Sequence, residues 1–276
     1  MSLQKIIPDV FSSDVTSVSD YKERIKKIQE YCKNIGENDW GTFFRGDKYC
    51  AKTQSHFFRE GNIADEAQNF EDWKQLIITN AEELDEFDQL AYMQHYQGNT
   101  RLLDFTKDSL VALRFACGES GDNCRKKVTI YCTNYLLLKT DDQKRQEVLG
   151  SYLRLIKDKP PIDGDEEQWK KDIFVEVEQN FPRIKRQKGL FLLMGNFTTE
   201  ELLGYSTDSA KNMRKKVTHE LSPNIGRGET YPGYVGVLTI AAGSVEKIRK
   251  ELEQTTCYQI NYLMGKENEV HSPCQP

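Results

Sequence analysis

Hydrophobic positions along the chain switch between helical and strand-like spacing. Between residues 19 and 34 apolar side chains recur every three or four positions, which predicts an amphipathic helix that ends near Gly36. Two further helical segments are expected between Ala64 and Tyr96, with a break near residues 78–80. Helices are also expected at about 106–117, 141–157 and 244–253, with Thr106 and Ser244 as N-caps of the first and last.

Short apolar runs between these helical segments predict strands. They fall at residues 40–47, 101–105, 128–132, 173–178, 189–193 and 234–240. Strands that alternate with helices indicate an α/β (α+β) fold, with a mixed sheet of about five to seven strands surrounded by helices.

The chain has no internal repeat, no low-complexity linker and no change of composition that would mark a boundary. We therefore expect a single domain over residues 1–276. Residues 1–18 are expected to be an irregular lead-in, about 135–172 a helical insertion, and about 266–276 a mobile tail.

Composition supports a well-packed globular protein. A chain of 276 residues can bury a core without disulfides, and its 38% apolar and 11% aromatic content argues against disorder. A net charge of -5 makes nucleic acid an unlikely partner, because such binding usually needs a basic face. With no signal-type leader and no apolar run of about 20 residues, we expect a cytoplasmic protein with no membrane partner.

The metal-binding residue types are sparse and scattered. The seven cysteines include no Cys-x-x-Cys pair, so reduced thiols are expected. The four histidines include no pair at ligand spacing, so no metal is expected. The nucleotide-binding and hydrolase signatures G-x-G-x-x-G, G-x-x-x-x-G-K-[ST], H-E-x-x-H and G-x-S-x-G are also missing from the sequence.

Polar groups with chemical uses are densest between Met93 and Thr106. His95 continues the buried stripe of one predicted helix at its end, where it is either a cap or core residue or a ligand contact. Arg101 and Asp104 lie on or beside a short buried strand, so each needs a partner or a ligand. The helix that Thr106 is expected to cap would direct an anion-binding N-terminus at this junction.

Arg45 closes an earlier strand, and Gly46 follows it. A buried arginine at a strand end usually has a fixed partner. Two roles stay open at this point: a salt bridge to a core carboxylate, or a clamp for an anionic ligand.

Taken in order, several blocks resemble the FRG domain family, named for its Phe-Arg-Gly motif. The blocks are Phe44-Arg45-Gly46, Gln94-His95-Tyr96, Thr100 to Thr106, Ala112 to Ala116, and Arg183 to Phe191. The resemblance covers about residues 40–195, and the family occurs mainly in bacteria and their phages. Two departures stand out: Gln97-Gly98-Asn99 replaces a Gly-Leu-Pro loop, and Phe105 replaces a tryptophan.

The order of these blocks is also similar to the layout of ADP-ribosyltransferases, which implies an NAD-using transferase or glycohydrolase. In that layout Arg45 would hold NAD, and Thr106 or Asp104 would brace the nicotinamide pocket. The group that polarises the ribose would be Gln187, or else Glu176 or Glu178. The blocks add Gly46, Thr100, Arg101, Arg183 and Glu178 as candidate ligand-binding residues, and His95 as a candidate catalytic one.

The resemblance implies a nucleotide or ADP-ribose-like small molecule as ligand, and a protein as a candidate acceptor. One alternative is a non-catalytic nucleotide- or anion-binding module, in which Arg45, His95, Arg101 and the helix N-terminus cradle a phosphate. Another is a partner-binding module, for instance in bacterial or phage defence, in which these charges pair only with one another.

Overall fold

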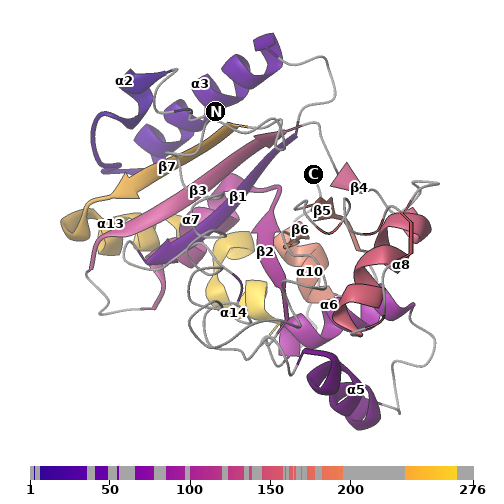
Figure 1. The fold of residues 1–276 in the computed structure, drawn as a ribbon. Helices are drawn as coiled ribbons and strands as arrows, with labels where there is room; N and C mark the ends of the chain where they lie inside the picture. The colour runs from indigo at the N-terminus through magenta and orange to yellow at the C-terminus, as the bar shows by residue number, and fades with distance from the viewer. Residues whose placement is uncertain are drawn as a thin grey trace, which may run out of the picture.

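The chain forms a single seven-stranded sheet with helices packed against it, as seen in a computed structural model (Figure 1). The predicted mixed sheet surrounded by helices is thereby confirmed. The structure describes residues 3, 7–35, 41–48, 55, 66–77, 85–96, 100–119, 124–133, 137–138, 145–157, 159, 162–163, 165, 169, 173–177, 182–194 and 234–265. The predicted tail at 266–276 lies outside them, and the predicted domain boundaries stay predictions.

The strands are out of sequence order in the sheet. Across it they run β4 (Leu137–Leu138), β5 (Ile173–Val175), β6 (Gly189–Leu193), β2 (Leu102–Thr106), β1 (Gly41–Lys48), β3 (Lys126–Thr133) and β7 (Tyr234–Ile240). Neighbours are antiparallel except β4, which is parallel to β5. Because β4 falls within residues 135–172, that segment adds a strand to the sheet as well as the helix α8 (Arg145–Ile156).

The sheet is weakly joined between β1 and β2. Strands β1 and β3 pair along their whole length, from Gly41 opposite Thr133 to Lys48 opposite Lys126. Between β1 and β2 the register joins Phe44 to Thr106. The sheet therefore has two wings: the β3 wing (β1, β3 and β7) and the β6 wing (β2, β6, β5 and β4).

Each wing has its own hydrophobic core. Helices α2 (Pro8–Phe11), α3 (Val18–Ile35), α7 (Ser109–Cys117) and α13 (Ala242–Glu253) pack on the β3 wing around Phe44 and Ile130. Helices α5 (Glu66–Ile77), α6 (Glu86–Tyr96), α8 and α10 (Pro182–Gln187) pack on the β6 wing around Phe191. Figure 1 shows α5, α6 and α8 gathered together and the long strands β7, β3 and β1 side by side.

The Phe174 ring bridges the two wings. Its centroid lies 4.6 Å from that of Phe43 and 5.1 Å from those of Phe105 and Tyr131. After α13 the chain forms a short 3-10 helix, η2 (Thr256–Tyr258), and then α14 (Ile260–Met264), which packs near α10. Aromatic packing thus holds together a sheet whose backbone pairing is short at β1 and β2.

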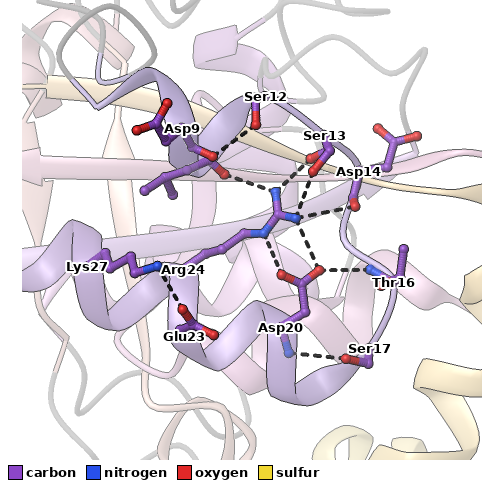
Figure 2. Close-up of polar contacts among 11 residues, drawn as sticks. Asp9, Ser12, Ser13, Asp14, Thr16, Ser17, Asp20, Glu23, Arg24 and Lys27 are labelled. Atoms are coloured by element: carbon purple, nitrogen blue, oxygen red, sulfur yellow. Dashed lines mark hydrogen bonds and ion pairs between the residues drawn. The ribbon is translucent and has the colours of Figure 1, made fainter.

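The N-terminal lead-in is more ordered than expected. Residues 8–11 form α2, and Val15 makes a parallel bridge to Ile240 at the edge of β7. Arg24 on α3 ties this segment down: its guanidinium binds the Asp20 carboxylate and the carbonyl oxygens of Val10, Ser13 and Asp14 (Figure 2). The prediction of an irregular lead-in was wrong for these residues, because an arginine can collect several separate backbone acceptors.

The start of one helix and the bonding of one cysteine differ from the predictions. Helix α13 starts at Ala242, ahead of the predicted cap Ser244. Cys32, Cys117, Cys124 and Cys132 are free, as predicted, but Cys257 is disulfide-bonded, which corrects the expectation of reduced thiols. None of the described helices is both long enough and apolar enough to cross a bilayer.

Candidate functional site

A cavity of about 270 Å³ lies where β1 and β2 diverge. It is lined from β1, β2, α6, α7 and α10 by Phe44, Arg45, Gly46, Gln94, Asp104, Phe105, Thr106, Val111, Ala112, Phe115, Arg183 and Gln187. The lining thus draws on the Phe-Arg-Gly block, the Gln94 and Thr100 to Thr106 blocks, the Ala112 block and the Arg183 block. Segments far apart in sequence converge on one hollow of mixed polar and aromatic character.

Gly46 allows helix α7 to pack closely against β1 at the cavity. A Cβ at Gly46 would lie 2.0 Å from the carbonyl oxygen of Ala112 and 2.5 Å from the backbone nitrogen of Ala116. Both distances are shorter than any real contact, and both are to backbone. The glycine of the Phe-Arg-Gly block is therefore needed for helix packing at the cavity.

The prediction that Arg45 closes its strand was wrong, because β1 continues to Lys48 in pairing with β3. Arg45 has a fixed carboxylate partner on this strand. Its Nε and Nη2 each donate to Asp47 at 2.9 Å, and its Nη1 donates to the backbone carbonyl of Asp104 at 2.9 Å. Burial on its own would lower the pKa of the guanidinium, but Asp47 and Asp104 outweigh it and raise that pKa. The salt-bridge alternative is therefore realised through Asp47, and Arg45 also lines the cavity.

Asp104 presents its carboxylate at the cavity, with 48% of its side chain exposed. Gln94 Nε2 donates to its Oδ2 at 2.9 Å, and Arg45 Nη1 lies 3.8 Å from the same oxygen. Thr100 is buried behind this pair and donates to Gln94 Oε1 at 2.6 Å. Thr100 therefore acts on the cavity through Gln94 rather than by lining it.

Thr106 has a different role from the predicted helix cap. Its hydroxyl donates to the carbonyl of Gln187 at 2.6 Å and accepts from the backbone N–H of Asp108 at 2.9 Å. Asp108 is the N-cap of α7 and accepts from the N–H groups of Leu110 and Val111. The prediction that Thr106 is the cap was wrong, because an aspartate two residues later competes for the same role. The Asp108 carboxylate already occupies the N-terminus of α7, which was expected to bind an anion.

Arg101 lies away from the cavity. Its side chain is fully buried, its Nε donates to Glu66 at 2.8 Å, its Nη2 also pairs with Glu66, and its Nη1 donates to the Met194 carbonyl at 3.1 Å. The structure thus places Arg101, just before β2, in an internal ion pair with Glu66 at the start of α5. It does not join Arg45 in a phosphate cradle.

The last sequence block contributes an amide to the cavity. Gln187 lines it at the end of α10, and its Nε2 donates to the Leu263 carbonyl at 3.0 Å. Glu176 instead pairs with Lys107 on the exterior. Glu178 and the side chain of His95 lie outside the described residues. Among the residues that line the cavity, Asp104 is therefore the acidic one.

Three site residues were not singled out by sequence reasoning. Gln94 and Phe115 were visible only as members of motif blocks. Asp47 could have been anticipated, because residues two apart on a strand point to the same side and Asp47 follows Arg45 at that spacing. Within the described part of the chain, no three His, Cys, Asp or Glu side chains gather as a metal site would require.

The fold and the cavity together define an α+β protein with a ligand-sized hollow at a split in its sheet. The sequence model of the family described as FRG domain matches residues 41–124. Residues 41–124 therefore match the FRG domain family, which confirms that resemblance over this range. The matched range includes Arg45, Gln94, Asp104 and Thr106, and ends before Arg183 and Gln187. No curated protein and no solved structure matches the chain.

Proposed function

We propose that the cavity at the β1 and β2 split binds NAD or a closely similar nucleotide, and that the protein is an NAD-using transferase or glycohydrolase. The observation that carries this proposal is the convergence of Arg45, Asp104 and Gln187 on one cavity. These are the residues that the ADP-ribosyltransferase layout assigns to NAD binding, to the nicotinamide pocket and to the ribose.

The size and lining of the cavity suit one end of a dinucleotide. Ligand pockets usually measure roughly 300 to 1,000 Å³, so a cavity of about 270 Å³ takes a ring and a sugar rather than a whole dinucleotide. Phe105 and Phe115 offer aromatic surface to a planar ring, and the Gln187 amide offers hydrogen-bonding groups. Arg45 and Arg183 bring guanidinium N–H groups that can donate to a phosphate.

The proposed chemistry is cleavage of the bond between the ribose and nicotinamide. The bonding electrons leave with nicotinamide, and water or an acceptor nucleophile attacks the ribose carbon and loses a proton. Positive charge develops on the ribose in the transition state, so a nearby carboxylate stabilises it electrostatically. Asp104 supplies that charge in the lining, because Gln187, which the layout assigns to the ribose, is uncharged.

A non-catalytic nucleotide sensor is the second candidate. It is favoured by Gln187, an amide at the position where the transferase layout carries a carboxylate, and by the bidentate pairing of Arg45 with Asp47. Such a module would bind the same ligands and leave them intact. Release of nicotinamide separates the two candidates.

Titration calorimetry with NAD at up to millimolar concentration, together with chromatographic detection of nicotinamide, tests the proposal. We expect binding by the wild type and loss of binding in a folded Arg45→Met variant. Binding with nicotinamide release supports the enzyme, and binding without release on long incubation with candidate protein acceptors supports the sensor. No heat of binding at millimolar NAD contradicts both.

A further inference from the structure

A directed series of hydrogen bonds ends on the Asp104 carboxylate. It begins at the backbone N–H of Leu102, which donates to Thr100 Oγ at 3.1 Å. The Thr100 hydroxyl donates to Gln94 Oε1 at 2.6 Å, and Gln94 Nε2 donates to Asp104 Oδ2 at 2.9 Å. An ionised carboxylate can only accept, so Gln94 must present Nε2 to Asp104 and the series has a defined direction from β2 to the cavity.

This direction sets the orientation of the Gln94 amide. If the amide were rotated by half a turn, its Oε1 would face the Asp104 carboxylate and two acceptors would oppose each other. The Thr100 hydroxyl opposes that rotation, because it satisfies Oε1 on the far side. Thr100 is buried, which excludes water as a substitute donor at this point.

The Asp104 carboxylate is therefore held at Oδ2 and open at its other edge. Gln94 and, at 3.8 Å, Arg45 both approach Oδ2. Among the described residues, the hydrogen bond and the ion pair to this carboxylate both reach Oδ2, and the side chain remains 48% exposed. The other described acidic groups nearby are engaged, since Asp47 binds Arg45 and Asp108 caps α7.

We propose that Asp104 is the carboxylate that contacts the ribose hydroxyls of the bound nucleotide, and that Gln94 and Thr100 are positioning residues that hold it. The proposal rests on the proposed function, because it assumes a nucleotide in this cavity. A pair of ribose hydroxyls presents two donors, and a carboxylate presents only acceptors, so their hydrogen bonds are charge-assisted. The open edge of Asp104 is where such a sugar would be recognised.

Dissociation constants for carba-NAD provide the test, because this analogue keeps the hydroxyls and resists cleavage. We expect Asp104→Asn to weaken binding at least about tenfold, as for loss of a charge-assisted hydrogen bond. Thr100→Val should weaken it about threefold to tenfold, Thr100→Ser should restore it, and Thr100→Val should have no further effect in the Asp104→Asn background.

Two outcomes overturn the inference while leaving the proposed function intact. In the first, wild-type protein binds carba-NAD and the dissociation constant of Asp104→Asn lies within about twofold of the wild-type value. Alternatively, Thr100→Val would weaken binding equally with and without Asp104→Asn, which indicates a general structural defect. If the wild type binds neither NAD nor carba-NAD, the proposed function fails and the ribose contact fails with it.

The positioning series has a ligand-free readout. The side-chain amide proton resonances of Gln94 should shift from their wild-type positions in Asp104→Asn and in Thr100→Val. In Thr100→Ser they should stay near those positions. Gln94 resonances that do not respond to Thr100→Val would overturn the role of Thr100 whatever the ligand does.

Discussion

Arg45 and Asp47 face each other on the same side of β1, with two parallel hydrogen bonds of 2.9 Å between guanidinium and carboxylate. Both side chains are largely buried, and Arg45 lines the cavity. The charge of the arginine in the Phe-Arg-Gly block is therefore balanced before any ligand binds. Such an arginine positions a ligand through its remaining N–H groups rather than acting as an isolated positive charge.

Removing Asp47 tests this relationship. Asp47→Ala leaves the Arg45 guanidinium without its bidentate partner, and we expect the free energy of unfolding to fall by about 2 to 4 kcal/mol. The double variant Arg45→Met with Asp47→Leu should lose less, because no buried charge remains. Urea denaturation of the three proteins measures both values. Equal losses in the single and double variants would show that the pairing is unimportant.

Gly46→Ala should be strongly destabilising. The added Cβ meets backbone atoms of α7 at 2.0 and 2.5 Å, so the helix has to move, and we expect a cost of about 3 kcal/mol or more. Gly150 on α8 is the matched control, since a Cβ there has nothing within 4 Å. Gly150→Ala should stabilise the protein by up to about 1 kcal/mol through helix propensity. Similar thermal midpoints for the two variants would contradict the close approach.

The buried pair of Arg101 and Glu66 should matter for folding and not for ligand binding. Glu66→Gln leaves the fully buried arginine uncompensated, and we expect a loss of about 3 to 5 kcal/mol in denaturant unfolding. The fraction that remains folded should bind NAD with wild-type affinity, because Arg101 does not line the cavity. A large loss of affinity without a loss of stability would place Arg101 in the site after all.

Asp165 should make stability depend on acid pH. Its burial would raise the pKa, but hydrogen bonds from Arg154 and from the backbone of Ile162 outweigh this and lower it below the ordinary value of 3.8. A lowered carboxyl pKa gives stability that is present above the ordinary pKa and is lost as the pH falls through the lowered one. Asp165→Asn should be less stable at neutral pH, with a shallower loss of unfolding free energy below about pH 4. A variant with an unchanged acid profile would exclude this contribution.

Free cysteines should differ sharply in reactivity. Burial raises the pKa of Cys117 to about 12, so its thiolate is scarce at pH 8, whereas Cys124 is exposed. Iodoacetamide followed by peptide mass spectrometry should label Cys124 in the native protein and Cys117 only after unfolding. Native labelling of Cys117 at a comparable rate would contradict its burial.

Much of the fold was accessible from the sequence, because apolar runs and helical spacing report burial directly. The predicted strands at 40–47, 128–132, 189–193 and 234–240 correspond to β1, β3, β6 and β7. The motif blocks also identified most of the polar residues that line the cavity, including Arg45, Asp104 and Gln187.

The contacts missed from the sequence depend on how the chain folds, which the spacing of residues along the chain does not encode. Glu66 lies 35 positions from Arg101, so nothing local assigns that arginine to an ion pair rather than to a ligand. Thr106 and Asp108 are both good helix caps, and only the backbone path decides between them. The bridge of Val15 to β7 joins opposite ends of the chain, which no periodicity predicts.

A crystal structure of the protein soaked with carba-NAD tests the central claim most directly. We predict ligand density in the cavity at the β1 and β2 split, with the ribose beside Asp104 and a phosphate within reach of Arg45 or Arg183. An unchanged cavity at millimolar ligand, or a nucleotide bound at another surface, would contradict the assignment of this site to NAD.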